Sequence, residues 1–318
     1  MIAALAGGVG AARFLTGLCA LVGPEAVTAV VNTGDDLRMH GLAVSPDLDT
    51  VTYTLAGLVD GERGWGRQGE TWAAMDALEV LAGAAPAASA AGTTWFRLGD
   101  RDLATHLYRT QRLAEGAALS EVTAEVASAL GLRCRLLPVT DDPVATRVGT
   151  ADGELAFQDW FVRRRHGVAV RHLRYEGAAE ARPAPGVLDA LGRAEAVVIC
   201  PSNPLCSIAP VLAVPGLTAA LAARRASVVA VSPLVAGAAL RGPADRVLAD
   251  LGHEASVVGV ARLYAEVAAA LVVDTADEAR AGEVAAAGVR PVVAPAVMHD
   301  RAAARALAAA TLAAAGVG

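Results

Sequence analysis

Short apolar runs alternate with amphipathic stretches near the start of the chain. Residues 1–6 are almost entirely apolar, a glycine-rich break follows at 7–10, and residues 11–22 carry apolar positions at helical spacing. Residues 26–31 form a second apolar run, rich in β-branched side chains. A strand, a helix and a second strand in this order predict parallel strands joined by a right-handed crossover. The loops that follow the two strands are therefore expected to face one crevice.

The middle of the chain has a different pattern. Helical periodicity is present in three stretches, 70–83, 100–116 and 119–131, and the alanine-glycine stretch 82–92 predicts a loop or a weak helix. An Asp-Gly turn at 152–153 lies between two β-rich runs, 147–150 and 154–164, and predicts a hairpin, to which 169–177 adds a third strand.

Alternation of strands and helices resumes near residue 187. We predict strands that begin near 195, 226, 270 and 289, with helices over 209–225 and 242–252. The fold class predicted is α/β, a Rossmann-like parallel sheet with an inserted helical and β-hairpin region. Residues 1–60 and 186–318 would form the nucleotide-binding core, and residues 61–185 an inserted substrate-binding cap.

Composition narrows the classes of protein that remain. The net charge is −6 and no long basic block is present, which argues against binding to nucleic acid. No apolar run is long enough to predict a membrane span, and the apolar start lacks the positive leader of a signal peptide. The four cysteines show no CxxC spacing, which favours free thiols in a reducing cytoplasm.

The glycine-rich break is the first candidate site. Gly7, Gly8 and Gly10 would let main-chain N–H groups approach a phosphate at a helix N-terminus. The dinucleotide-binding template is only partly matched, because Arg13 occupies its third glycine position. A tight turn without a ligand stays open as an alternative.

Four aspartates within 15 residues form the second candidate site. Asp35 and Asp36 follow the second strand, and Asp47 and Asp49 lie in the first turn of a helix predicted over 45–57, with Ser45 as its N-cap. Carboxylates are ligands that Mg²⁺ prefers, often together with substrate phosphates. The helix dipole favours aspartate in a first turn, which is an alternative explanation for Asp49 in particular.

Small polar residues follow other strands of the predicted sheet. Ser202, Asn203 and Ser207 follow the strand near 195, and Ser232 follows the next one, so all four are candidates for the nucleotide. A plain turn explains the first three equally well. The loop of Asn32, Thr33 and Gly34 ends the second strand and is assigned to the same nucleotide site.

An acidic helix start at 100–106 offers further side chains. Asp102 and His106 are four residues apart and share a helix face, and Asp100 precedes them. A helix-stabilising pair and a substrate contact are equally good explanations. No nucleophile–base pair stands out, and phosphoryl-type transfer proceeds by positioning and charge neutralisation with little covalent help from the protein.

Seven ordered motifs resemble one known family over essentially the whole chain. They are GGVGAARFL, VNTGDD…HGL…SPDLDTVTYTLAG, WFRLGDRDLATHLYRTQRL, LLPVTDDPVATRV, FQDWFVRRR, PSNPLCSIAPVLAVPG and VSPLVAGAALRGPADRVL. Together they closely resemble the 2-phospho-L-lactate transferases, CofD in archaea and FbiA in mycobacteria, which make coenzyme F-420 precursors. A lone glycine loop would be a weak signal, whereas seven motifs in order are specific.

The resemblance implies a cytoplasmic, Mg²⁺-dependent transferase that is commonly a homodimer. Its donor is a three-carbon acid linked to guanosine diphosphate, and its acceptor is the deazaflavin FO. The terminal hydroxyl of FO attacks the phosphorus that bears the acid, and GMP leaves. On this basis Asp35 and Asp47 are expected to act in catalysis and lead the metal ligands, Asp36 and Asp49 support them, and Asp100, Asp102 and His106 are candidates for FO.

Two points stay open at this stage. The acid can be lactate or enolpyruvate, and the alanine-rich composition resembles actinobacterial members, which tend to use enolpyruvate. A non-enzymatic regulator of the same fold that binds nucleotide sugars is the main alternative, although the segment after Asp36 lacks its glycine- and serine-rich stretch. An NAD(P)-dependent oxidoreductase is disfavoured by Arg13.

Overall fold

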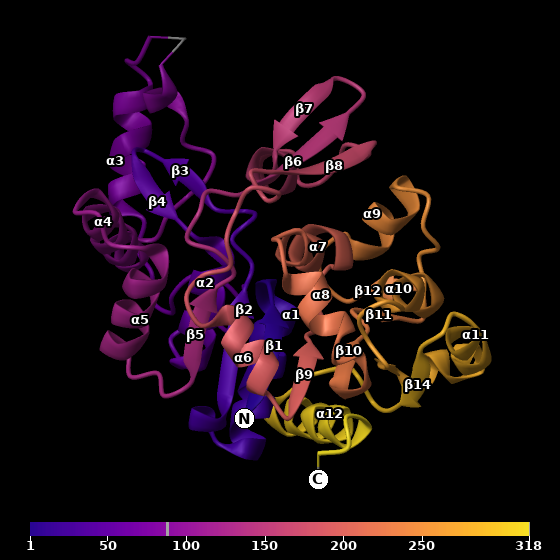
Figure 1. The fold of residues 1–318 in the computed structure, drawn as a ribbon. Helices are drawn as coiled ribbons and strands as arrows, with labels where there is room; N and C mark the ends of the chain where they lie inside the picture. The colour runs from indigo at the N-terminus through magenta and orange to yellow at the C-terminus, as the bar shows by residue number, and fades with distance from the viewer. Residues whose placement is uncertain (87–88, 318) are drawn as a thin grey trace.

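A seven-stranded parallel sheet forms the centre of the computed structural model, which describes residues 1–86 and 89–317 (Figure 1). Every neighbouring pair of strands in it is parallel. The strand order across the sheet is β14 (Arg290–Val293), β13 (Ala270–Val273), β10 (Val228–Val231), β9 (Ala196–Ile199), β1 (Ile2–Ala6), β2 (Val27–Val31) and β5 (Arg135–Pro138).

Helices cover both faces of this sheet, because side chains of each strand point alternately to opposite sides. Leu5 belongs to one core cluster, whereas Ala4 and Ala6 belong to the other. The cluster of Ala4 is closed by α1 (Gly8–Val22), α2 (Pro46–Leu55), α5 (Leu119–Ala129) and α12 (Arg301–Ala314). The cluster of Leu5 is closed by α6 (Val187–Arg193), α7 (Ala209–Leu212), α8 (Leu217–Ala222), α9 (Ala244–Asp250), α10 (Val257–Tyr264) and α11 (Ala281–Ala286).

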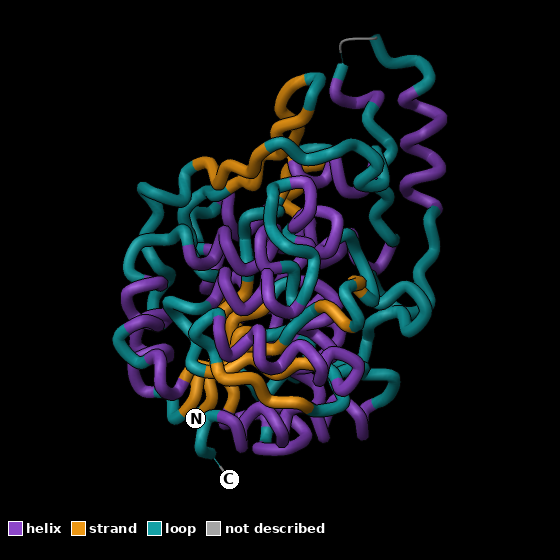
Figure 2. Tube along the Cα trace, turned by 90° about the vertical axis from the view of Figure 1, so that its right-hand side faces the viewer, coloured by secondary structure: helices purple, strands orange, loops and turns teal. Residues whose placement is uncertain are grey.

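A cap lies beyond the central sheet, at the end of the molecule opposite the two termini (Figures 1 and 2). Its helices are α3 (Ala73–Ala82) and α4 (Asp100–Ala114), and its antiparallel sheet has the order β7 (Gly153–Ala156), β6 (Ala145–Thr150) and β8 (His172–Glu176). Two small hairpins complete the strands, β3 (Leu37–Met39) with β4 (Leu42–Val44) and β11 (Leu234–Val235) with β12 (Ala238–Ala239).

The structure confirms the predicted fold class, and it differs from the predicted elements in three places. β5 lies inside 61–185 but pairs with β2, so the region expected to be a pure insertion also supplies an edge strand of the central sheet. The helix predicted over 209–225 is broken at Pro215 and Gly216, where Gly216 has a φ of 90°. The strand predicted over 154–164 ends at Ala156, and Asp159–Arg163 forms a wide helical turn.

Two other expectations can be compared with the structure. All four cysteines are free thiols, as expected from their spacing. None of the helices in the described residues is long and apolar enough to cross a membrane. Residues 87–88, within the stretch predicted as a loop or weak helix, lie outside the described residues.

Candidate active site

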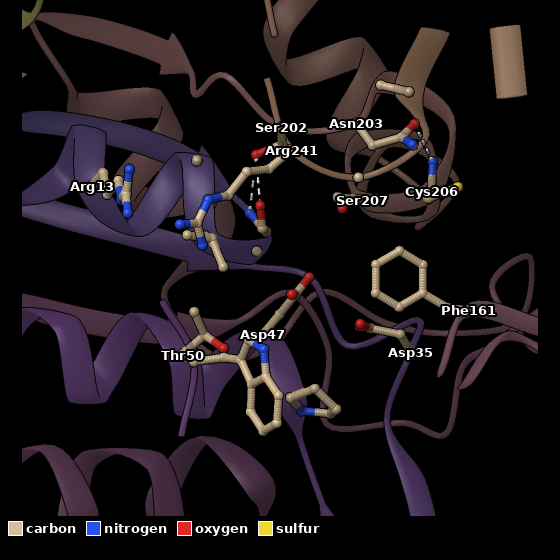
Figure 3. Close-up of a pocket in the computed structure, with 18 of the residues that line it drawn as sticks. Arg13, Asp35, Asp47, Thr50, Phe161, Ser202, Asn203, Cys206, Ser207 and Arg241 are labelled. Atoms are coloured by element: carbon tan, nitrogen blue, oxygen red, sulfur yellow. Dashed lines mark hydrogen bonds between the residues drawn. The ribbon is translucent and has the colours of Figure 1, made fainter. Parts of the chain in front are cut away.

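A cavity of about 770 Å³ opens at the carboxyl ends of the central strands, between the sheet and the cap (Figure 3). Four successive loops line it, those after β1, β2, β9 and β10. The register of the sheet explains why they meet: Ala6 is paired with Val31 and Leu5 with Ile199, so the three strands end at the same level. The expectation that the first two loops face one crevice is confirmed.

Close packing explains the glycines of the loop after β1. A Cβ atom on Gly10 would lie 2.3 Å from the carbonyl oxygen of Pro201, and one on Gly7 would lie 2.6 Å from Asp47 Oδ2. Gly8 has a φ of 72°, in the left-handed region that side chains rarely adopt. The loop is therefore held against its neighbours at distances that only glycine permits, and its main chain borders the cavity directly.

Asp35 and Asp47 converge on one amide group. Asn32 Nδ2 donates to Asp35 Oδ1 at 2.9 Å and to Asp47 Oδ2 at 3.0 Å, and Asn32 Oδ1 accepts from the main-chain N–H of Gly34 at 2.8 Å. Thus Asn32, which ends β2, fixes both carboxylates beside the glycine loop.

Within residues 1–86 and 89–317, no ion pair balances the charges of these two carboxylates. Burial, followed by the charges of Asp47 and Asp36, raises the pKa of Asp35 well above its ordinary value. Burial raises the pKa of Asp47 to about 6, although hydrogen bonds from Asn32 and Gly8 oppose the shift. No cationic side chain is among the groups that set either pKa. A buried carboxylate without a cation is unfavourable, so a bound cation would stabilise the ionised pair.

The other two aspartates of the predicted cluster have partners in the protein. Asp36 Oδ2 accepts from Ser45 Oγ at 2.7 Å, which explains why Ser45 does not cap α2 with its own side chain. Asp36 lines a second, smaller cavity of about 420 Å³, whose wall Asp35 shares. Asp49 lines the main cavity, but Arg109 donates to both of its oxygens, in one case at 3.1 Å.

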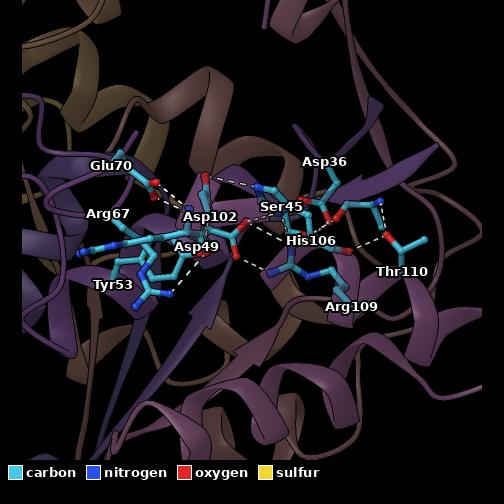
Figure 4. A network of polar contacts seen from close by, with 12 residues as sticks. Asp36, Ser45, Asp49, Tyr53, Arg67, Glu70, Asp102, His106, Arg109 and Thr110 are labelled. Carbon is cyan, nitrogen blue, oxygen red and sulfur yellow. Dashed lines mark hydrogen bonds and ion pairs between the residues drawn. The ribbon is translucent and has the colours of Figure 1, made fainter. Parts of the chain in front are cut away.

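Asp49 belongs to a buried polar network between α2 and α4 (Figure 4). His106 Nδ1 lies 3.7 Å from Asp49 and His106 Nε2 lies 3.3 Å from Asp102, while Tyr53 Oη donates to Asp102 at 2.6 Å. Burial opposes ionisation of Asp102, but the contacts with His106 and Tyr53 outweigh it and lower its pKa. Within this network Arg109 supplies the positive charge opposite Asp49, and Tyr53 and His106 contact Asp102.

This network is also the one group of metal-ligating side chains that comes together among the described residues. Ligand atoms of Asp49, Asp102 and His106 lie within 4.8 Å of one another, an arrangement that could hold a metal ion. The guanidinium of Arg109 already supplies a positive charge to Asp49 there. We therefore regard Asp35 and Asp47, which have no such partner, as the better pair for a cation.

Replacing Arg109 with Met is expected to destabilise the fold by about 3–5 kcal/mol, because it leaves Asp49 buried without its partner. Urea unfolding measures the change. Arg112→Met is the matched control, since Arg112 lies on the same helix and pairs with Glu125 near the surface, where an ion pair contributes little. Equal losses in the two variants would show that the buried pair does not hold α2 against α4.

Several predicted nucleotide-binding side chains form hydrogen bonds with main-chain groups of the loops around the cavity. Ser202 Oγ donates to the carbonyl of Gly7 at 2.9 Å, Asn203 Oδ1 accepts from two main-chain N–H groups of the next turn, and Ser232 Oγ donates to Leu234. These three side chains and Ser207 all line the cavity. Thr33 is buried and lines neither cavity, and Gly34 lines the smaller one.

The three candidates for the acceptor separate in the structure. Asp102 and His106 line the main cavity, whereas Asp100 does not. Asp100 accepts from the main-chain N–H groups of Ala73 and Ala74, both at 3.0 Å, and from the hydroxyl of Thr71. Its contacts therefore fix the start of α3.

Aromatic residues of the cavity were missed by the sequence analysis. The chain has only four Trp, four Tyr and four Phe residues, and half of these twelve line the cavity. No pattern in the sequence distinguishes them from aromatic residues of the core, such as Phe14 and Trp160, because either location can bury the ring. Those that line the cavity are Tyr53, Trp65, Trp95, Phe96, Phe157 and Phe161.

A family model and the curated relatives of this chain all name one group of transferases. The family model described as 2-phospho-L-lactate transferase CofD matches residues 2–314. The chain is 45% identical over 305 residues to a protein named phosphoenolpyruvate transferase from Kitasatospora aureofaciens, covering 94% of this chain and 92% of that protein. It is 44% identical over 304 residues to the protein of the same name from Streptomyces coelicolor, covering 94% and 93%.

Solved structures share the fold at low sequence identity. A crystal structure of a UPF0052 family member from Bacillus halodurans aligns with a TM-score of 0.60 at 17% identity and covers 98% of both chains. A second crystal structure of the Bacillus halodurans protein aligns with a TM-score of 0.57 at 15% identity and covers 92% of both. At these identities the likeness concerns the fold alone.

Proposed function

The chain belongs to the 2-phospho-L-lactate transferase CofD family and is a transferase of coenzyme F-420 biosynthesis, and from this premise we propose the reaction in detail. It moves a phosphoenolpyruvyl group from a guanosine diphosphate-linked donor to the terminal hydroxyl of the deazaflavin FO and releases GMP. The single observation that carries the proposal is that a glycine loop and two uncompensated buried carboxylates face one cavity.

The enolpyruvyl donor is preferred over the lactyl donor for two reasons. Curated relatives that are 42% to 47% identical to this chain carry the name phosphoenolpyruvate transferase. The alanine-rich composition of the chain also resembles that of actinobacterial members of the family, which tend to use enolpyruvate. Lactyl transfer is the alternative that the experiment below tests directly.

We propose that Asp35 and Asp47 hold Mg²⁺. Three observations support a cation at these two carboxylates. Both are buried, both accept a hydrogen bond from Asn32, and both have a raised pKa that a bound cation would lower. When bound, the ion offsets negative charge on the donor diphosphate and on the departing phosphate. Asp49 contributes less to metal binding, because Arg109 already neutralises its charge.

The protein itself contributes binding and orientation. The main-chain N–H of Gly10, in the first turn of α1, would face the donor phosphates, whereas the N–H of Gly8 donates to Asp47 and holds that carboxylate in place. One aspartate of the pair orients the acceptor hydroxyl toward phosphorus. The new oxygen–phosphorus bond forms as the bond to GMP breaks, the hydroxyl proton passes to the carboxylate of that aspartate, and GMP leaves with the electron pair of the broken bond. Exclusion of water by the cap favours transfer to FO over hydrolysis.

The aromatic side chains that line the cavity support the proposal of a planar acceptor. Phe161 and Trp95 line the cavity, and Phe161 lies beside Asp35 (Figure 3), so a deazaflavin ring would stack on these side chains with its polyol chain directed at Asp35. Asp102 and His106 offer polar contacts in the same cavity. This arrangement would set the acceptor hydroxyl and the donor phosphorus on the same side of the two carboxylates.

Mass spectrometry of the product tests the proposal. Purified protein, FO, Mg²⁺ and either the enolpyruvyl or the lactyl donor are incubated, and the acceptor product and GMP are quantified together. We expect one GMP per transferred group, faster transfer of enolpyruvate, and loss of both products in EDTA. If neither donor reacts and the protein binds a UDP-sugar in place of FO, the nucleotide-sugar regulator is the better assignment.

A further inference from the structure

Two arginine side chains border the same cavity and were not assigned by the sequence analysis (Figure 3). Arg13 lies on α1, one turn beyond Gly10, and Arg241 lies in the loop between β12 and α9. The two positive charges lie close enough to interact: partial burial, and then the charge of Arg241, lower the pKa of Arg13.

Arg97, which also lines the cavity, has an acidic partner in Asp76. Across residues 1–86 and 89–317, no carboxylate lies within ion-pair distance of Arg13 or Arg241. The fold thus holds two guanidinium groups near each other without an acid between them, although like charges repel.

Arg241 is held in position by main-chain atoms. It donates to the carbonyl of Arg63 at 2.8 Å and to that of Glu62 at 3.4 Å. A Cβ atom on Gly64 would lie 2.8 Å from Arg241 Nη1 and 3.0 Å from Val9 Cγ1. The guanidinium therefore lies where residues 62–64 approach the glycine loop, and neutral acceptors fix it without cancelling its charge.

We propose that Arg13 and Arg241 form a clamp that binds an anionic group of the donor between them. This inference rests on the proposed function and deepens it by assigning the residues that recognise the donor. A planar guanidinium donates paired hydrogen bonds to two oxygens of a carboxylate or a phosphate. The donor carries both groups, on its three-carbon acid and its diphosphate, and an anion bound here would also relieve the repulsion between the two arginines.

Binding measurements on three variants test the clamp. Arg13→Met and Arg241→Met each remove one guanidinium, and Arg305→Met is the matched control, since Arg305 is exposed on α12 and does not line the cavity. Calorimetric titrations use GDP, inorganic pyrophosphate and phosphoenolpyruvate. We expect affinity to fall about tenfold to a hundredfold in both cavity variants and to stay unchanged in the control.

The probes separate the two anionic groups. Weaker binding of GDP and pyrophosphate assigns the clamp to the diphosphate, and weaker binding of phosphoenolpyruvate alone, with pyrophosphate unaffected, assigns it to the carboxylate. Unchanged binding of all three probes, or an equal loss in the Arg305 variant, would overturn the clamp. Wild-type protein that binds none of the probes would overturn it too.

Two further measurements distinguish the clamp from a structural role and from the proposed reaction. Removing one of two repelling charges is expected to leave the melting temperature of ligand-free Arg13→Met equal to or above that of the wild type, whereas loss of a structural contact would lower it. If FO receives no group but probe binding falls as expected, the reaction is wrong and the clamp stands. If both variants transfer at the wild-type rate and donor KM, the clamp is wrong and the reaction stands.

Discussion

Replacing Asp35 with Asn is expected to reduce the rate of transfer to FO by about a hundredfold or more, with the fold intact. The amide keeps an oxygen that can accept the hydrogen bond from Asn32, so the loop after β2 retains its geometry. What the variant loses is the negative charge beside Asp47, and with it the proposed attraction for Mg²⁺. Rates are measured by GMP release at saturating donor and FO.

The ligand-free stability of the same variant provides an independent check. Because the pKa of Asp35 in the folded state is raised above its ordinary value of 3.8, the folded protein holds this proton more tightly than the unfolded chain does. Stability is therefore lost as pH rises from about 4 through the raised pKa, and above it the full unfavourable contribution is present. Asp35→Asn removes that contribution, so at pH 8 without metal the variant should unfold at a higher temperature than the wild type.

An exposed aspartate supplies the matched control. Asp152 lies in the turn between β6 and β7, and Asp152→Asn makes the same chemical change away from the cavity. Its turnover and stability should remain those of the wild type. Normal turnover in Asp35→Asn would remove this carboxylate from the mechanism, and a lower ligand-free stability at pH 8 would mean that its charge is compensated in the folded protein.

Replacing Gly7 with Ala is expected to reduce transfer by about a hundredfold, because a displacement of about 1 Å at a reacting centre is sufficient for such a loss. The added Cβ atom would lie 2.6 Å from Asp47 Oδ2 and 2.7 Å from Ser207 Cβ, so at least one of them must move. The φ of Gly7 is −163°, which alanine adopts without strain, so the effect arises from the neighbours and not from the backbone.

Measurements of stability and of ligand affinity distinguish the effects of Gly7→Ala on the fold from its effects on the site. Overpacking of this kind is expected to lower stability by about 1–3 kcal/mol, while GDP and Mg²⁺ lose affinity together, since the carboxylate and the loop are displaced as a unit. Gly192→Ala is the control, because a Cβ atom there meets open space on α6. Unchanged transfer in Gly7→Ala would show that the contact between Gly7 and Asp47 does not set the geometry of the site.

The main features of the fold follow from local sequence patterns. Period and length of the apolar runs identify β1, α1 and β2, and parallel pairing then requires Gly7 and Asn32 to leave the sheet side by side. For this reason the glycine loop and the aspartates could be assigned to one crevice without a structure. Pro215 and Gly216 are a local signal for the end of a helix. The apolar residues at helical spacing on both sides of them nevertheless led to the prediction of one continuous helix.

Partners distant in the sequence account for what the patterns missed. Asp47 and Asp49 are two residues apart on α2 and look equivalent in the sequence, yet Arg109, 60 residues away, pairs with one, and Asn32 binds the other. Likewise β5 was assigned to the insertion because a short apolar run does not reveal which strand it pairs with. Such contacts depend on how elements pack, and packing is not encoded in local periodicity.

The sequence by itself thus determined the α/β sheet, the edge at which ligands bind and the chemical types gathered there, because strand direction and loop position follow from local order. Only the tertiary structure decided which carboxylates keep an uncompensated charge, which aromatics line the cavity and that Arg13 and Arg241 lie near each other. Burial and distance set the charge balance of a site, and both arise when segments far apart in the chain pack together.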